Sequence, residues 1–464
     1  MKTKHTIVPT NFLVIISFFL SISLFGQDSE WEFLFDGSNF DNFDKLNGKA
    51  DYHIENGIMV GVSKRNTPNT FMATKKKYSD FILEFYVWVE NGLNSGVQFR
   101  SNSFPDWNKG RVHGYQCEIE TSARKWAGGI YDEARRGWLY PLTRNPKGQE
   151  AFVSGEWNHY RIEAIGSEIR TWINGIQCAN LIDGLTAEGF IAFQVHAIGS
   201  DFDAGKTVRW KDIKILTTDL ENQRKPVSAY APEISYLDNT LTTNEIRKGW
   251  RLLWDGKSNK GWRGSKLKEF PENGWEIKDG ELSVLSSAGE ESNNGGDIVT
   301  NEIFSDFELS VDFKLTEGAN SGIKYFVDTE LNKGNGSSIG LEFQVLDDKK
   351  HPDAKEGKNG NRTVGSLYDL IRAESKDAGR RGKNFKGVNK WNNARIKVRG
   401  GKVEHWLNHV LVVSFDRFSQ EFAALVEKSK YESWSNFGRV ESGYILLQDH
   451  GNLVSFKNIK VREF

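Results

Sequence analysis

Two stretches of the chain alternate polar and apolar residues so that carboxylates and amides gather on one face of a predicted strand. Carboxylates beside amides and bases can take up and return protons, so the chemistry they suggest is general acid–base catalysis. A polar strand face more often points to solvent. The site interpretation is favoured because the polar types recur in both stretches and curved sandwiches bind ligands in a hollow. The residues on these faces are Gln116, Glu118 and Glu120 in the first stretch, and Glu342 and Gln344 in the second.

A second pair of strands brings basic groups to the same faces. Each begins with Asn-Ser-Gly, at 94–96 and 320–322, and alternation then places Gln98 and Arg100, or Lys324, beside the acids. Two histidines, His196 and His450, each follow a closing-strand glutamine by two positions, Gln194 and Gln448. A single histidine is more often a structural hydrogen-bonding group than a catalyst, but this repeated spacing raises both as candidates.

These motifs belong to an internal repeat. The aromatic-rich runs 78–85 and 304–311, the Asn-Ser-Gly strands and the acid-bearing strands are all separated by the same offset. Each copy has Asp-Gly or Asn-Gly turns between short alternating runs, which predict β-hairpins. Many short strands with glycine-rich turns predict an antiparallel sandwich in each copy. We therefore predict an all-β fold with two domains, 28–216 and 248–464, joined by a polar linker at 217–247. A short capped helical turn at 242–248 leads into the second domain.

Composition narrows the function. The chain carries 61 Lys+Arg against 62 Asp+Glu, so it has no overall field that would attract nucleic acid. Aromatic residues make up 12%, which suits sheet cores and sugar-stacking surfaces. The only cysteines are Cys117 and Cys178, too few for a disulfide framework or a Cys-rich zinc site. Apolar counterparts in the second copy favour buried thiols, although one disulfide between them stays open.

The N-terminal segment predicts export. Residues 1–26 combine Lys2 and Lys4 with an apolar run from Phe12 to Phe25, which is short for a membrane span and typical of a signal peptide. The expected location is periplasmic or secreted, with no stable membrane span after the signal is removed. An uncleaved anchor is the alternative.

The motifs resemble the 3-keto-disaccharide hydrolase family, once per copy. The resemblance rests on the opening Asp-Gly, the Asn-Ser-Gly strand, the run 340–348, the Trp-Asn and Trp-x-Asn pairs, and the closing run 448–451. It implies two concanavalin A-like jelly-roll sandwiches and cleavage of glycosides that carry a ketone at sugar C3. It also implies a carbohydrate substrate and a separate oxidoreductase that makes the ketone, since no dinucleotide-binding glycine motif is present.

A 3-ketone acidifies the proton at C2, so the expected steps are removal of that proton, stabilisation of the enolate and protonation of the leaving oxygen at C1. In the second copy we expect Glu342 or Asp347 as the base, Lys324 as the enolate stabiliser, and His450 or Tyr368 as the proton donor. The matching set in the first copy is Glu118, Glu120, Arg100 and His196. Predicted substrate-binding residues are Gln98, Tyr131, Asp132, Trp138, Gln194, Gln344, Tyr368 and Gln448.

Three alternatives stay open. In one, the sandwiches hold glycans on Trp and Tyr surfaces without catalysis, as lectins do. Glu118 and Glu120, two apart on one strand, allow a glycoside hydrolase with two carboxylates. No metal ligand set is predicted, but the clustered carboxylates of 347–355 are the ligand type that calcium takes, although their spacing fits a charged surface loop better.

Overall fold

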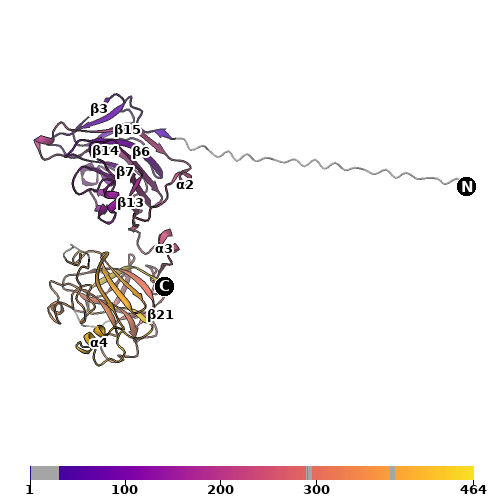
Figure 1. Cartoon of the computed structure of the whole chain (residues 1–464), viewed down its shortest axis with the longest axis vertical. Helices are drawn as coiled ribbons and strands as arrows, with labels where there is room; N and C mark the ends of the chain where they lie inside the picture. The colour runs from indigo at the N-terminus through magenta and orange to yellow at the C-terminus, as the bar shows by residue number, and fades with distance from the viewer. Residues whose placement is uncertain (2–30, 289, 291–294, 377–381) are drawn as a thin grey trace. The chain divides into compact units, whose positions relative to one another are not determined.

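The computed structural model describes residue 1 and residues 31–288, 290, 295–376 and 382–464, which form two compact units, Met1–Ile234 and Ser235–Phe464 (Figure 1). The predicted signal peptide lies outside the described residues apart from Met1. No helix within these ranges is long and apolar enough to cross a membrane. The boundary between the units falls inside the segment 217–247.

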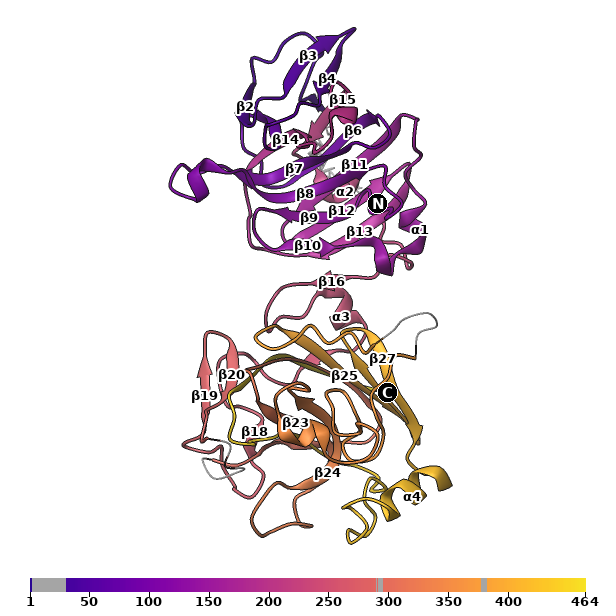
Figure 2. The ribbon, with the colours of Figure 1, turned by 90° about the vertical axis from the view of Figure 1, so that its left-hand side faces the viewer.

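The first unit is a sandwich of two antiparallel sheets (Figure 2). In spatial order, the first sheet contains β16 (Ile234–Ser235), β13 (Ile176–Ile182), β12 (Glu168–Ile173), β11 (Asn158–Ile165), β6 (Phe81–Val89), β15 (Thr207–Leu216), β4 (Ile58–Val62) and β3 (Asp51–Glu55), with β1 (Glu32–Phe33) paired to β15. The second contains β10 (Gly137–Tyr140), β9 (Ile130–Glu133), β8 (His113–Glu120), β7 (Asn94–Asn102), β14 (Phe190–Val195), β5 (Thr70–Thr74) and β2 (Phe43–Asn47).

The second unit is built in the same way. Its larger sheet contains β19 (Trp275–Lys278), β20 (Glu281–Val284), β29 (Val454–Glu463), β22 (Phe307–Leu315), β25 (Asn392–Arg399), β26 (Lys402–Leu407) and β27 (Val410–Asp416), with β17 (Arg251–Leu252) paired to β29. Its smaller sheet contains β18 (Trp262–Gly264), β21 (Ile298–Phe304), β28 (Gly443–Leu447), β23 (Asn320–Asp328) and β24 (Ile339–Leu346).

The two units share one strand order. The path β13-β12-β11-β6-β15-β4-β3 in the first matches β27-β26-β25-β22-β29-β20-β19 in the second, and β8-β7-β14-β5-β2 matches β24-β23-β28-β21-β18. Strands from the beginning and the end of each unit lie next to each other, as in a jelly roll. The predicted all-β class, with two jelly-roll sandwiches in tandem, is confirmed.

Helices are short and lie in the connections. The predicted capped turn at 242–248 is confirmed, because Thr242 and Glu245 form a capping box at the start of α3, which lies within the second unit. The helical segments in the described ranges are η1 (Asn108–Gly110), η2 (Leu142–Arg144), α1 (Pro146–Gln149), η3 (Asp201–Asp203), α2 (Leu220–Gln223), α3 (Thr243–Arg247), η4 (Pro352–Lys355) and α4 (Gln420–Glu427).

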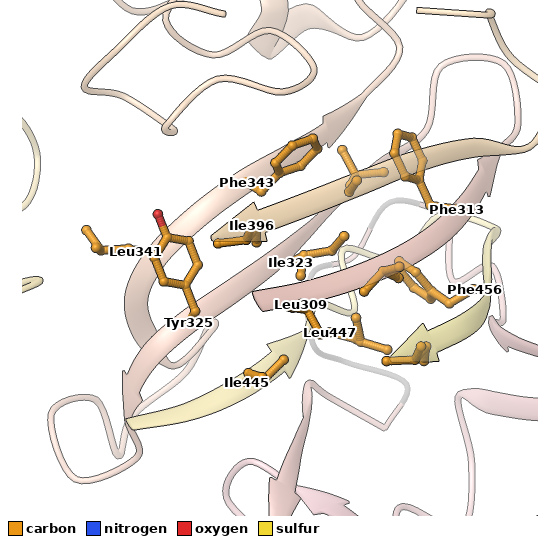
Figure 3. Packing of buried hydrophobic residues seen from close by; sticks show 14 of the residues in the cluster. Leu309, Phe313, Ile323, Tyr325, Leu341, Phe343, Ile396, Ile445, Leu447 and Phe456 are labelled. Atoms are coloured by element: carbon orange, nitrogen blue, oxygen red, sulfur yellow. The ribbon is translucent and has the colours of Figure 1, made fainter. Parts of the chain in front are cut away.

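Apolar side chains fill the space between the sheets of each unit. In the second unit, β22, β25 and β29 of the larger sheet face β23, β24 and β28 of the smaller sheet, and Figure 3 shows Phe313, Phe343 and Phe456 within this core. Because Ile323, Tyr325, Leu341 and Phe343 point inward, the alternate residues of β23 and β24 must point to the other face of the sheet. Both cysteines are buried free thiols in the core of the first unit.

Candidate active site

A pocket of about 250 Å³ lies on the outer face of the smaller sheet in the second unit. Its floor comes from β23 and β24, and its walls come from the loop before β24, the loop after it, and the segment after α4. The lining residues are Asn320, Lys324, Ser337, Ser338, Ile339, Gly340, Glu342, Gln344, Tyr368, Lys430, Tyr431, Trp434, Gln448 and His450.

An ion pair lies on the floor of this pocket. Lys324 and Glu342 face each other across the β23–β24 ladder, with Nζ 3.7 Å from Oε2, and both side chains are almost fully buried. The Lys324 ammonium also donates hydrogen bonds to the Ser337 hydroxyl and, at 3.2 Å, to the Ser338 carbonyl. Behind them, the Ser337 hydroxyl donates to Asp297 at 2.5 Å. Burial raises the pKa of Asp297, and the nearby Lys324 charge opposes this rise.

Three buried polar atoms of the pocket residues make no hydrogen bond within the described part of the chain. They are Asn320 Oδ1, Ser338 Oγ and His450 Nδ1. Buried polar groups in proteins are almost always paired, so unpaired atoms that gather around one cavity indicate a polar ligand. Sugar hydroxyls can both donate to and accept from such atoms.

Aromatic and basic side chains form one wall of the pocket. The Lys430 ammonium lies 4.3 Å from the ring centroid of Tyr368 and 5.3 Å from that of Tyr431. Tyr431 is buried and stacks on Phe437, with 4.0 Å between the ring centroids. Burial is the main cause that raises the pKa of Tyr368, and the negative charge of Glu342 adds to the rise.

Six of the residues predicted for the second copy meet in this pocket: Lys324, Glu342, Gln344, Tyr368, Gln448 and His450. The seventh, Asp347, does not line it. Its carboxylate accepts hydrogen bonds from the backbone of Gly318 and Lys349, both at the end of the sheet. Asp347 therefore holds a turn at the edge of the floor.

Two of the carboxylates considered for calcium, Asp348 and Asp353, pair with basic side chains. Arg362 pairs with Asp353 and Asp369, each at 2.7 Å, and Lys383 pairs with Asp348 at 2.7 Å. Among the residues that the structure describes, no group of three or more His, Cys, Asp or Glu side chains is arranged to hold a metal ion.

In the first unit, β7 and β8 form the sheet face that is equivalent to the pocket floor of the second unit. This face carries two amide side chains at the positions of the ion pair. Gln98 and Gln116 pair across β7 and β8 at the positions equivalent to Lys324 and Glu342, and Gln98 Nε2 donates to Gln116 Oε1 at 2.7 Å. Gln194 donates to the same oxygen at 2.9 Å. The carboxylate nearest to this amide pair is Glu118, which stands two residues further along β8 on the same face, opposite Gly96.

An arginine covers the acids of the first unit. Arg124 pairs with Glu120 at 2.7 Å and with Glu118 at 3.3 Å, and its guanidinium lies 4.7 Å from the rings of both Trp126 and Trp138. Burial raises the pKa of Glu118 to about 7, while hydrogen bonds from Asn94 and Gln116 oppose the rise. The predicted binding residue Tyr131 lies beside this group, with its ring 5.2 Å from that of Trp138.

Three residues predicted for the first copy lie apart from this floor or at its edge. A bulge in β7 gives Arg100 a φ of 45° and lets its buried guanidinium bind the carbonyls of Ser79 and Gly166 and the Asp80 carboxylate. Asp132 lies on the opposite face of β9 from Tyr131 and pairs with Arg135 and Arg136. His196 follows β14, and its Nδ1 is 2.6 Å from the Ala197 carbonyl oxygen.

Sequence reasoning missed the residues that enclose the pocket. Asn320 stands in the repeated Asn-Ser-Gly motif but was not assigned a role, and Ser337 and Ser338 precede β24 without a pattern of their own. Lys430, Tyr431 and Trp434 lie in the connection between β27 and β28, residues 417–442. The equivalent connection of the first unit, 183–189, is far shorter. This difference in length between the two repeats is the sequence signal from which the three residues can be found.

Comparison with known proteins gives a consistent result. A family model described as "3-keto-alpha-glucoside-1,2-lyase-like domain" matches residues 30–216 and 249–462. A 3-keto-disaccharide hydrolase of Bacteroides thetaiotaomicron is 34% identical over 234 residues, which span 46% of this chain and 78% of that protein.

Solved structures are also similar. The crystal structure of a putative glycosyl hydrolase from Parabacteroides distasonis is 28% identical and has a TM-score of 0.42, covering 49% of this chain and 100% of that one. A second putative glycosyl hydrolase of the same organism is 24% identical, with a TM-score of 0.34, and covers 46% of this chain and 99% of that one.

Proposed function

Because the chain belongs to the 3-keto-alpha-glucoside-1,2-lyase-like family, we propose that it cleaves 3-keto-glycosides and that the pocket of the second unit is its active site. The observation that carries the proposal is the Lys324–Glu342 pair on the pocket floor, where a carboxylate base and a cation lie 3.7 Å apart. The name of the 34% identical relative, 3-keto-disaccharide hydrolase, supports the same substrate class.

The proposed reaction begins with proton transfer. Glu342 removes the proton at C2, and the electron pair of that bond moves toward the 3-ketone to form an enolate. The Lys324 ammonium stabilises the enolate oxygen, where the negative charge develops. The enolate then expels the substituent at C1, and addition of water to the resulting double bond completes a net hydrolysis.

The unpaired atoms of the pocket suit substrate binding. Asn320, Ser338 and His450 offer buried polar atoms for sugar hydroxyls, and Trp434 adds an aromatic surface at the rim. The volume of about 250 Å³ is just below the range of about 300–1,000 Å³ that encloses drug-sized ligands. The pocket therefore suits one sugar ring, with the leaving group directed outward.

We assign the catalysis to the second unit alone. In the first unit, Gln98 stands in place of the cation and Gln116 in place of the base, and Arg124 pairs with Glu120 and Glu118. An amide does not take up a proton at neutral pH, so Gln116 lacks the role of base that we propose for Glu342. We propose that the first unit is a structural or glycan-holding partner of the catalytic unit.

Two further parts of the proposal concern the cell. We propose that the N-terminal segment directs export to the periplasm or the medium, as its basic and apolar pattern indicates. We also propose that a separate oxidoreductase supplies the ketone, because the elimination needs an acidified C2 proton that an ordinary glycoside lacks.

The competing enzyme class needs two carboxylates at the scissile bond. Within the described residues that line the pocket, Glu342 is the one carboxylate. This lining favours elimination over hydrolysis by paired acids.

The test uses matched glucosides with and without the 3-ketone, in H₂O and in D₂O. We expect cleavage of the keto compound alone, with deuterium incorporated at C2 of the released sugar. The Glu342→Gln variant should lose about 10²- to 10⁴-fold in rate, and Glu118→Gln should retain activity. Cleavage of the compound without a ketone would favour two-carboxylate hydrolysis, and binding of both sugars without turnover would make the protein a lectin.

A further inference from the structure

A second lysine faces the pocket from its wall. Lys430 lies in the segment that follows α4, and its ammonium lines the cavity against the face of the Tyr368 ring. Its position is fixed from both sides: the Lys430 backbone N–H donates to the Asp369 carboxylate at 3.3 Å, and the next residue, Tyr431, is buried against Phe437.

The Lys430 ammonium has unused donors. Within the described part of the chain it makes neither a hydrogen bond nor an ion pair, and its contacts are with the Tyr368 and Tyr431 rings. Lys324, by contrast, is occupied by Ser337, Ser338 and Glu342. A lysine has three donors, so Lys430 can present an N–H to a ligand without first breaking a protein contact.

The surroundings of Lys430 also favour release of a proton. The Lys430 residue as a whole is exposed, but partial desolvation of its ammonium against the pocket wall lowers the pKa of Lys430. The positive charge of Lys324 lowers this pKa further, while Glu342 opposes the change. An acid whose pKa is closer to the working pH transfers its proton more readily.

We propose that Lys430 is the catalytic acid that protonates the departing glycosidic oxygen. This inference rests on the proposed function and completes it. At this stage Glu342 holds the proton taken from C2. The electron pair of the enolate then forms the C1=C2 double bond, and the ketone at C3 is restored. As this happens, the C1–O bond breaks, and the electron pair of that bond takes a proton from Lys430 Nζ. The alcohol leaves, Glu342 is neutral and Lys430 is a neutral amine.

Hydration restores both groups by the reverse path. The Lys430 amine takes a proton from water as the water oxygen bonds to C1. Glu342, whose carboxyl proton exchanges with solvent after the alcohol has left, donates a proton to C2. The net reaction is 3-keto-glycoside plus water giving the 3-keto sugar and the alcohol, so no further reactant is needed.

The two donors expected from sequence are less suited to this step. The Tyr368 hydroxyl interacts with Asp353, and its pKa is raised, so it holds its proton. His450 lies beyond β28 and the floor residue Gln448, and its buried Nδ1 is unpaired, which suits a sugar hydroxyl.

The test compares two 3-keto-glucosides that differ in their leaving group. The methyl glucoside releases a poor leaving group that needs protonation, whereas the 4-nitrophenyl glucoside releases a stable anion that does not. We expect Lys430→Gln to lose about 10²- to 10⁴-fold in kcat/KM on the methyl compound and to stay within about threefold of wild type on the nitrophenyl compound. Lys430→Arg should show the same loss, because arginine keeps the charge but does not release its proton.

Control variants separate this inference from the proposed function. Glu342→Gln should lower turnover of both compounds, and Lys428→Gln, two residues from Lys430 and outside the pocket lining, should lower neither. Circular dichroism and thermal unfolding establish that each variant is folded. Three outcomes would overturn the role of Lys430 and leave the proposed function standing. They are equal losses of activity of Lys430→Gln on both compounds, no loss on either compound, and full activity of Lys430→Arg on the methyl compound. Failure of wild type on both compounds would overturn both.

Discussion

The ion pair on the pocket floor can be replaced by the amide pair that the first unit already contains. The variants are Lys324→Gln, Glu342→Gln and the double variant, which recreates the Gln98–Gln116 arrangement, where the amides are 2.7 Å apart. At a separation of 3.7 Å and an effective dielectric constant of about 20, the attraction between Lys324 and Glu342 is about 4.5 kcal/mol. Desolvation of two nearly buried charges offsets much of this attraction.

Each single variant leaves one buried charge without its main partner, so we expect each to destabilise the second unit by about 2–3 kcal/mol. The double variant removes both charges and should be more stable than either single variant, with a coupling of about 2 kcal/mol. All three variants should lose activity on 3-keto-glucosides by about 10²-fold or more.

Urea unfolding followed by hydrogen exchange of peptides from β23 and β24 would read the second unit separately. If the two single losses simply add in the double variant, the pair is not coupled and the reasoning fails. If the double variant is stable and still turns over substrate, the catalytic assignment of the pair fails.

Four further outcomes follow from the structure. The pKa of Glu118 is raised from 4.5 to about 7, so the unfolded chain releases this proton at lower pH than the folded chain does. The first unit should therefore lose about 3 kcal/mol of stability as pH rises from about 4.5 to 7. Urea unfolding measured across this range should show the loss in wild type and not in Glu118→Gln. Arg124→Ala should destabilise the first unit by about 1–3 kcal/mol through loss of its ion pair with buried Glu120, and turnover of 3-keto-glucosides should be unchanged. Trp434→Ala should raise KM about 3- to 10-fold, as expected for loss of an aromatic contact of about 0.5–1.5 kcal/mol, with kcat nearly unchanged. Treatment with EDTA followed by calcium should leave activity unchanged, because Asp348 is paired with Lys383, and Asp353 and Asp369 are paired with Arg362; a loss that calcium restores would contradict this.

The floor of the site could be predicted from sequence because it depends on local rules. Strand alternation and the repeated motif are enough to place Lys324, Glu342 and Gln344 on one face, since the pleat fixes the direction of every second side chain. The tight turns were equally accessible: Asp279 and Gly280 both adopt positive φ in the β19–β20 hairpin, as an Asp-Gly pair predicts.

Strand alternation does not give the correct side-chain direction where the strand pairing is irregular. It also excludes placing two adjacent residues of a strand in one site. The register shift between Phe99 and Asn102 turns Arg100 away from Gln98, and a bulge of this kind leaves little trace in sequence. Asp132 was grouped with Tyr131, although adjacent residues of a strand face opposite sides.

The wall of the pocket could not be predicted because it depends on packing between distant segments. Tyr368 and Lys430 meet over Glu342 through two long connections that have no sustained periodicity. Strand patterns say where such a connection begins and ends but not how it folds.

The unequal connections between the last strands of the two units bear on how new chemistry can arise on an old scaffold. The connection of the second unit, 417–442, is roughly four times as long as its counterpart at 183–189, and closing a flexible loop of that greater length costs only about 1 kcal/mol more. The sheets below it keep the same strand order in both units. A duplicated sandwich can therefore acquire a walled cavity through one longer loop at small energetic cost, while its twin keeps a short connection over the same strand order.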